Sequence, residues 1–541
     1  MSLAVRAEPG RRARAEGAWR GLERLLDRAF GAEANALRHL GALGFFFFWC
    51  AAASGIYLFV AYDTSAAGAW RSVNAITRGD WPASGLARSL HRYSADAFVA
   101  VMLLHLLREL LAGHYRGFRW FSWITGVPPL VLAYASGIGG FWLAWDDLAQ
   151  FSAVATAEWL DALHLSADPF VRNFLTAEAV NDRLFSLFMF LHIGLPLALL
   201  GAMWVHVHRV SHAETLPRRA LAAGAGLMLL GMALAAPVAI RAEAVVTQMP
   251  QSLPLDLLLL FPHALMYATS PGTLWAVVLG TLALLFAAPL IARGKATQSA
   301  PAAQTALPAP LTQVTQAARI DPANCNGCGR CLADCPFGAV TLAPRSDGRR
   351  APRIAEVSPD LCAACGICAG ACPSSTPFRS AEDFTSGIDL PQFRVATLRA
   401  TLDEALALPR GERARVVLFG CDRAADAMRL VDLDTIALSL ICAGMLPPSL
   451  IEYTLRSGAD GVLITGCRPG ECEFRLGNQW IEERLSGTRE PHLRASVPRG
   501  RVRLAWAAHD EPSRLAGALE VFRNTLSALG PMRARCGARR E

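Results

Sequence analysis

Long apolar runs in the first half of the chain predict an all-α bundle of membrane-spanning helices. Five uncharged stretches approach the ~20 residues that a helix needs to cross about 30 Å of hydrocarbon. They lie at residues 40–62, 120–145, 184–208, 220–240 and 273–292. A sixth stretch, 88–113, is apolar but carries charged residues, which are costly in a membrane and tend to be functional there. We therefore expect about six transmembrane helices within residues 1–292.

The apolar pattern changes after residue 292 and predicts a multidomain chain. Residues 293–318 are rich in Ala, Pro, Gln and Thr and form a predicted linker, and residues 319–380 are compact and rich in Cys, Pro and Gly. Beyond them, short buried-strand patterns alternate with helical stretches, which predicts a doubly wound α/β domain over 413–530. The strands are expected at residues 415–420, 435–441 and 460–466.

The placement of arginine predicts the orientation in the membrane. Arginines cluster before the first predicted span and after the second and fourth, whereas the opposite loops carry mainly Asp and Glu. The positive-inside rule then places the N-terminus in the cytoplasm, and six spans place the C-terminal half there too. We expect a multi-pass protein of the inner (cytoplasmic) membrane, with residues 16–38 as an amphipathic surface helix. The net charge of +7 reflects this topology, so no nucleic-acid partner is expected.

Four histidines in the apolar half form two equally spaced pairs. His91 and His105 are 14 residues apart, as are His192 and His206. Fourteen helical residues rise about 21 Å and end about 40° short of four turns, so each pair lies on one helix face. Two such helices can hold two b-type haems, with each iron between two neutral imidazoles. A single membrane histidine is more often a packed polar residue, but the matched spacing favours ligands.

Two glycine pairs repeat the same interval in neighbouring spans. Gly41 and Gly55 lie in the first span, and Gly126 and Gly140 lie in the third. A porphyrin needs a flat surface beside it, and glycine, which has no side chain, provides one. The glycines therefore support the interpretation of the histidines as haem ligands.

These segments resemble cytochrome b of the quinol-oxidising bc-type complexes over about residues 20–292. The resemblance rests on Arg88-Ser-Leu-His91 through His105-Leu-Leu-Arg108, on Gly140-Phe-Trp-Leu-Ala-Trp145, and on His192-Ile-Gly-Leu-Pro196 to His206. It implies an outer haem between His91 and His192. It likewise implies a cytoplasmic haem between His105 and His206.

The resemblance also assigns two arginines and shows two departures. Arginines at the places of Arg88 and Arg108 meet haem propionates in the family, which suits a bidentate contact with a carboxylate. Where the family carries Pro-Glu-Trp-Tyr at its outer quinol site, residues 254–257 read Pro-Leu-Asp-Leu. The proton-relaying glutamate is therefore missing, and Asp256 is the candidate substitute. The proline of a family Pro-Trp motif is Ala144. An electron-bifurcating outer site of the standard kind is therefore not expected.

Eight cysteines spell the motif C-x-x-C-x-x-C-x-x-x-C-P twice, which is the signature of a small α+β dicluster ferredoxin domain. Three closely spaced thiolates bind one 4Fe-4S cubane, and the fourth reaches the other. Structural zinc and disulfides are the alternatives, but zinc sites usually lack this double run and disulfides are rare in cytoplasm. The first cluster is assigned to Cys325, Cys328, Cys331 and Cys372, and the second to Cys335, Cys362, Cys365 and Cys368.

Four further cysteines each follow or end a predicted strand. They are Cys421, Cys442, Cys467 and Cys472. The carboxyl ends of parallel strands converge at one edge, so these thiols can meet there. Residues 457–478 resemble the delta subunit of methyl-viologen-reducing hydrogenases, over about 413–530, although Cys421 stands alone where that family often has C-x-x-C. The resemblance implies one 2Fe-2S cluster and a heterodisulfide-reductase-type flavoprotein partner; buried cysteines without a ligand role are the alternative.

Every recognised site is a one-electron carrier, which predicts a membrane electron-transfer subunit. Electrons are expected to pass from a cytoplasmic flavin/iron–sulfur partner, of heterodisulfide reductase or dehydrogenase type, to quinone in the membrane lipid. The expected order is 2Fe-2S, two 4Fe-4S clusters, cytoplasmic haem, outer haem and quinone, with His263 as a candidate quinone contact. Alternatives are the reverse direction and a membrane anchor for a soluble redox complex. Whether two chains form a homodimer is left open.

Overall fold

The computed structural model describes residues 11–530 except 165–166, 175, 177, 209, 211–212, 249–252, 255, 296–315 and 379–384. The chain forms two compact units. The first is Met1–His208 with Ala213–Ala306, and the second is Arg209–His212 with Leu307–Glu541. The predicted linker 293–318 lies mostly outside the described residues. The predicted ferredoxin and α/β regions belong to the same compact unit.

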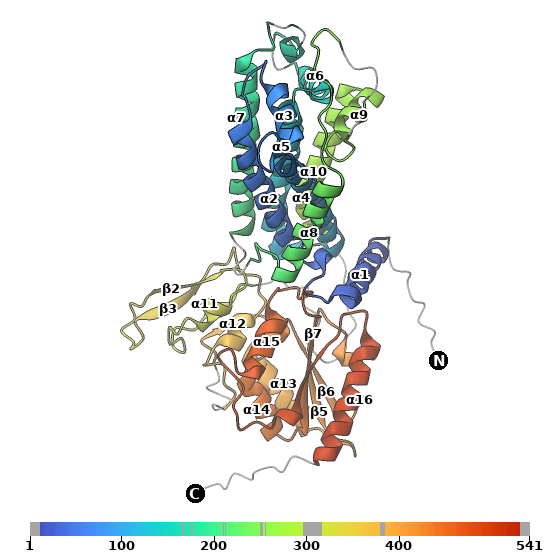
Figure 1. Cartoon of the computed structure of the whole chain (residues 1–541). Coiled ribbons are helices and arrows are strands. Elements are labelled where there is room, and N and C mark those ends of the chain that lie inside the picture. Colours follow the sequence, from blue (N-terminus) through green and yellow to red (C-terminus); the bar gives the residue numbers. More distant parts are fainter. Residues whose placement is uncertain are drawn as a thin grey trace. The chain divides into compact units, whose positions relative to one another are not determined.

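The described part of the first unit is built from helices (Figure 1). They are α1 (Arg11–Phe30), α2 (Leu40–Ala61), α3 (Ala69–Arg78), α4 (Ser84–Ala112), α5 (Trp120–Trp142), α6 (Asp147–Asp161), α7 (Asp182–Val207), α8 (Arg219–Ala235), α9 (Phe261–Ala268) and α10 (Pro271–Lys295). Short 3₁₀ turns lie at η1 (Ala36–Arg38), η2 (Gly117–Arg119) and η3 (Phe170–Phe174). This confirms the predicted all-α class of the N-terminal half.

Four of these helices are long and apolar enough to cross a membrane: α2, α5, α7 and residues Pro271–Ile291 of α10. The predicted span 88–113 is the 29-residue helix α4, whose charged residues set it apart from those four. The predicted fifth span is shorter than expected, because α8 ends at Ala235. Pro237 follows closely, and a proline drives the preceding residue out of the helical region.

The predicted surface helix over 16–38 is α1, and it ends eight residues early, at Phe30. Gly31 follows with φ +79°, a left-handed conformation that commonly stops helices. The apolar side chains of this amphipathic helix are partly exposed, with Leu22 at 45% and Phe30 at 66%. The buried residue of α1 is Glu23, at 3% exposure.

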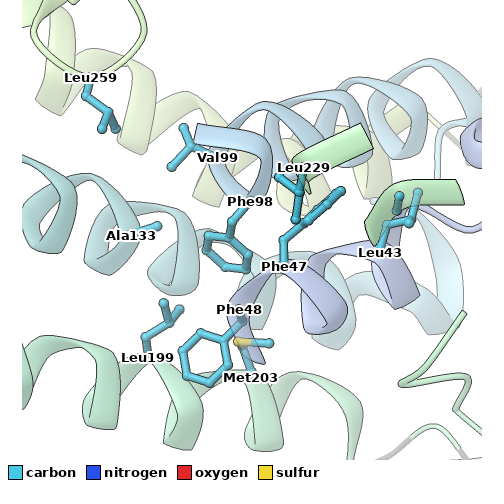
Figure 2. Packing of buried hydrophobic residues seen from close by; sticks show 11 residues of the cluster. Leu43, Phe47, Phe48, Phe98, Val99, Ala133, Leu199, Met203, Leu229 and Leu259 are labelled. Atoms are coloured by element: carbon cyan, nitrogen blue, oxygen red, sulfur yellow. The ribbon is translucent and has the colours of Figure 1, made fainter. Parts of the chain in front are cut away.

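The core of the bundle is an apolar layer between α2, α4, α5 and α7 (Figure 2). On each of these helices one residue of the layer lies seven positions after the first glycine or histidine of its pair. These residues are Phe48, Phe98, Ala133 and Leu199. All four are buried, and the rings of Phe48 and Phe98 are 6.2 Å apart. The layer therefore occupies the middle of the 14-residue interval.

The second unit begins with two small antiparallel ribbons. Strand β1 (Arg319–Ile320) pairs with β4 (Ile388–Asp389), and β2 (Val340–Pro344) pairs with β3 (Arg353–Val357). Two short helices carry cysteines, α11 (Arg330–Asp334) and α12 (Ile367–Ala371). Gly329 and Gly366 precede these helices, both with φ +76°, so the two halves repeat one turn. This confirms the small α+β region.

The rest of the second unit is built on a parallel sheet. Its elements are α13 (Val395–Ala407), β5 (Val416–Cys421), η4 (Ala427–Leu430), β6 (Thr435–Leu440), η5 (Ala443–Met445), α14 (Pro448–Arg456), β7 (Gly461–Gly466), α15 (Gly477–Ser486), η6 (Arg499–Arg501), β8 (Val502–Trp506) and α16 (Pro512–Leu529). The strand order is β6-β5-β7-β8, with helices flanking the sheet (Figure 1). This confirms the α/β class and the three predicted strands, and adds β8.

This strand order creates a switch point. The chain moves from β5 to β6 on one side and then returns to β7 on the other side of β5. Open parallel sheets bind ligands at the carboxyl ends of the strands where the order reverses. Cys421 ends β5 and Cys467 follows β7, so the fold places two predicted ligands at this point.

Candidate electron-transfer sites

Two pairs of histidines face each other between α4 and α7. The rings of His91 and His192 have centroids 6.1 Å apart and planes at 75°. Two metal–imidazole bonds of about 2 Å, together with the radii of both rings, come to roughly this separation. His105 likewise lies within electrostatic range of His206. The structure therefore brings the histidines together in the predicted pairs, and the first gap fits one iron with two axial imidazoles.

Hydrogen bonds leave one ring nitrogen of these histidines free. Nδ1 of His91 lies 2.8 Å from the carbonyl oxygen of Ala51, and Nδ1 of His192 lies 3.2 Å from that of Ser136. A carbonyl only accepts, so each Nδ1 donates its proton. In the neutral ring this tautomer leaves the Nε2 lone pair available to a metal.

Each of the four predicted glycines lies against one of the histidines. At three of them an added Cβ would stand 2.9–3.0 Å from Cε1 of the facing ring, which is closer than a Cβ normally approaches. At Gly41 the corresponding distance is 3.9 Å, an ordinary contact. The contacts are Gly41 with His105, Gly55 with His91, Gly126 with His206, and Gly140 with His192.

These glycines also expose the carbonyl groups that bind the histidines. Ala51 and Ser136 each lie four residues before a glycine of the set, and so does Ser122, whose carbonyl binds His206. A helical side chain leans toward the N-terminus and covers the preceding turn. Without a side chain the carbonyl at i−4 is open to the ring. Sequence analysis explained these glycines by the porphyrin surface alone and missed this role.

The two predicted propionate arginines bond to protein groups. Arg88 donates to Thr77 Oγ1 at 2.6 Å and to the carbonyl of Val238 at 3.2 Å. Arg108 donates to Glu23 at 2.9 Å and to Glu109 at 3.2 Å. Both arginines are thereby held on the turn next to a histidine. Their contact with propionates stays a prediction.

Two further predicted residues have definite surroundings. Asp256 forms an ion pair with Arg92, and its Oδ1 accepts hydrogen bonds from two backbone amides at 2.9 and 2.8 Å. His263 is fully buried, with Nε2 3.0 Å from Thr156 Oγ1. Asp256 therefore has a structural role at the start of the turn that precedes α9.

The first predicted set of ferredoxin cysteines lines one cavity. Cys325, Cys328, Cys331 and Cys372 all border it. Cys328 is the exposed member, whereas Cys331 is buried. Burial, together with the neighbouring thiols, raises the pKa of Cys331 to about 12. Such a thiol is a poor nucleophile, and binding to iron is what would ionise it.

The second predicted set is assembled deeper in the unit. The thiols of Cys335, Cys362, Cys365 and Cys368 interact electrostatically with one another. Backbone amides donate to two of these sulfurs, Ala339 N to Cys335 at 3.2 Å and Ala318 N to Cys362 at 3.4 Å. Hydrogen bonds of this kind are typical of iron–sulfur ligands and help to set their reduction potential.

The four C-terminal cysteines converge at the switch point of the sheet. The sulfurs of Cys467 and Cys442 lie close enough to that of Cys472 to interact with it, and Cys467 also interacts with Cys421. These interactions hold the pKa of Cys472 well below its usual range. All four are buried. Among the described residues, no three or more His, Cys, Asp or Glu side chains form a single-ion site. Four convergent thiols are a ligand set that an iron–sulfur cluster can use.

The fold and these sites define a membrane electron-transfer protein with histidine and cysteine centres. Family models match three parts of the chain: cytochrome b/b6/petB at 26–213, the 4Fe-4S dicluster domain at 324–376, and the delta subunit of methyl-viologen-reducing hydrogenase at 417–530. All three confirm the resemblances identified from sequence. Cytochrome b6 of Synechococcus sp. (strain JA-3-3Ab) is 30% identical over 161 residues, which are 29% of this chain and 73% of that protein.

The chain belongs to the cytochrome b family. A solved structure described as a hyperthermophilic respiratory Complex III is also similar, at 18% identity and a TM-score of 0.39 over 47% of this chain and 74% of that chain. Membership implies haem b in the helical unit, and the dicluster domain implies 4Fe-4S clusters in the second.

Proposed function

We propose that this chain relays electrons between a soluble flavin/iron–sulfur partner and the quinone pool. The observation that carries the proposal is the assembly, in one chain, of two facing histidine pairs and three sets of four cysteines. The partner is of the heterodisulfide reductase or dehydrogenase type. The hydrogenase delta-subunit match supports this class of partner.

The residues divide among five prosthetic groups. Two haems b, two 4Fe-4S clusters and one 2Fe-2S cluster would supply the one-electron chemistry when bound. The histidine pairs hold the haem irons, and the glycines Gly41, Gly55, Gly126 and Gly140 keep the rings in place. The three cysteine sets hold the clusters, with Cys421, Cys442, Cys467 and Cys472 binding the 2Fe-2S group. The N-terminus and both iron–sulfur regions lie in the cytoplasm.

The contacts of Asp256 favour electron flow toward quinone over quinol oxidation. Quinol oxidation needs a group that is free to accept a proton from the quinol. Asp256, the candidate from sequence, is instead bound to Arg92 and to two backbone amides. An occupied carboxylate is a weaker acceptor, because its negative charge is already stabilised.

Stopped-flow spectroscopy of membranes tests the relay. With the reduced partner protein as donor, haem b should be reduced before quinone, and the quinone should then reoxidise it. Pyridine haemochrome assay should give two haems per chain, and non-haem iron should total about ten. Quinone reduction that proceeds with haem b still oxidised would contradict the relay. A chain without haem would instead support the anchor role.

A further inference from the structure

The ferredoxin region and the C-terminal cysteine site meet inside the second unit through glycines. An added Cβ on Gly370 would stand 2.4 Å from the carbonyl oxygen of Gly444. An added Cβ on Gly444 would stand 2.8 Å from Cα of Gly477. An added Cβ on Gly477 would stand 2.1 Å from the sulfur of Cys442. Helix α12, the turn η5 and helix α15 therefore pack backbone against backbone. Little protein separates the two sites here.

The thiols across this contact belong to particular sets. Cys365, of the second ferredoxin set, interacts electrostatically with Cys472 and Cys442 of the C-terminal site. Cys331, of the first ferredoxin set, interacts with Cys325, Cys328 and Cys372 of its own set. The neighbour of the C-terminal site is thus the second set.

One buried arginine ties the elements of this contact together. Arg484, on α15, is 0% exposed. It donates to the carbonyl of Gly444 at 2.7 Å, to Asp334 Oδ2 at 2.5 Å and to the carbonyl of Ile367 at 3.4 Å. Asp334 directly precedes Cys335, and Ile367 directly precedes Cys368. The guanidinium therefore binds next to ligands of both sites.

Its carboxylate partner is held independently. Asp334 Oδ1 accepts from Arg489 at 2.7 Å, and its carbonyl accepts from Trp480 Nε1 at 3.1 Å. The guanidinium of Arg489 lies 3.3 Å from the centroid of the Trp480 ring. Replacing Arg484 therefore leaves Asp334 with a cationic partner.

We propose that Arg484 is the positioning residue of this junction. It fixes the C-terminal cysteine site against the Cys335/Cys362/Cys365/Cys368 set and makes that cluster the direct electron partner of the 2Fe-2S group. The first set, with its exposed Cys328, is then the far end of the cysteine path. The inference rests on the proposed function, because it needs both sites to hold clusters. Arg484 also places a positive charge beside both sites, which stabilises their reduced forms.

EPR spectroscopy of the reduced, detergent-solubilised full chain tests the proposal. A nearby reduced 4Fe-4S cluster shortens the spin relaxation of a 2Fe-2S cluster, which raises the microwave power needed to saturate its signal. In Arg484→Met we expect this power to fall several-fold and both midpoint potentials to shift downward. Arg484→Lys keeps the charge, but its single nitrogen cannot replace the two nitrogens with which the guanidinium binds Gly444 on one side and Asp334 and Ile367 on the other. It should therefore recover the potentials and not the relaxation. It also provides a folded variant if the Met variant does not assemble.

Arg501→Met is the matched control. Arg501 is also buried in the C-terminal region and bonds to the carbonyls of Asp460 and Gly530, at 2.9 and 2.7 Å. It precedes β8 and so lies at the amino end of the sheet, away from the cysteines. Its replacement should leave relaxation and potentials unchanged. If the 2Fe-2S signal of the Arg484 variants relaxes as in the wild type, the inference is overturned and the proposed relay is unaffected. A chain with full 4Fe-4S content and no 2Fe-2S signal would instead overturn the proposed 2Fe-2S site itself.

Discussion

At the residue scale, the histidine sites depend on glycines in the facing helices, which have no side chain. The rings of His91, His192 and His206 each have a carbonyl acceptor four residues before the facing glycine, which also leaves room for the ring edge because it has no Cβ. The 14-residue spacing was visible in the sequence. The bond to the carbonyl four residues earlier was not, because it depends on how neighbouring helices face each other.

Gly140→Ala should remove the haem held by His91 and His192. The added Cβ would stand 2.9 Å from the His192 ring and would push it away from its carbonyl acceptor. We expect the pyridine haemochrome content to fall by about half. Gly139→Ala is the control, because nothing lies within 4 Å of its Cβ position. In Gly41→Ala the added Cβ would stand 3.9 Å from the His105 ring, so this variant should keep both haems. Loss of one haem in Gly41→Ala would refute this steric account.

Replacing Asp256 separates a structural role from a proton-relay role. Asp256→Asn loses the ion pair with Arg92 but keeps an acceptor for the backbone amides, so stability should fall by about 1 kcal/mol. Asp256→Ala loses the amide bonds as well, which should cost about 1 kcal/mol more. The temperature of haem release measures both. If Asp256→Asn keeps wild-type stability but abolishes haem reduction by quinol, Asp256 is instead a proton acceptor.

At the element scale, the sequence predicted helices and strands well where a continuous apolar run marked the element. Continuous apolar runs predicted β5, β6 and β7, but β8 was missed because Arg503 interrupts its apolar pattern and Arg501 directly precedes this edge strand. Composition extended α1 through Gly31, whose positive φ ends the helix. The contact between Gly370 and Gly444 carries no local sequence signal, since it joins distant segments.

The apolar layer between the two histidine levels should be the main source of stability of the bundle. Phe98 is 5% exposed and contacts Phe48 in the middle of the layer. Phe98→Ala should lower the free energy of unfolding by about 3–5 kcal/mol, because it leaves a cavity that the helices fill only partly. Leu104→Ala, on the outward face of α4 with 38% exposure, should cost much less in detergent. Haem-release temperatures that fall equally in the two variants would contradict this role.

At the scale of the whole molecule, the number of crossings decides where the iron–sulfur half lies. In the described part of the chain, four helices qualify as spans by length and composition. α4 must cross as well if His91 and His105 are to meet His192 and His206 at both levels of α7. α8 is therefore decisive, because its 17 residues span about 25 Å, slightly less than the hydrocarbon thickness.

Reporter fusions to the C-terminus determine whether α8 crosses. Six spans keep both ends on the same side, whereas five place the cysteine sites opposite the N-terminus. We expect green fluorescent protein fused after Glu541 to be fluorescent and alkaline phosphatase at the same point to be inactive, since the positive-inside pattern predicts a cytoplasmic N-terminus. Phosphatase inserted after Tyr62, just beyond α2, should be active and serves as the control. An active phosphatase at the C-terminus would mean that α8 does not cross, and a cytoplasmic partner could then not reach the iron–sulfur sites.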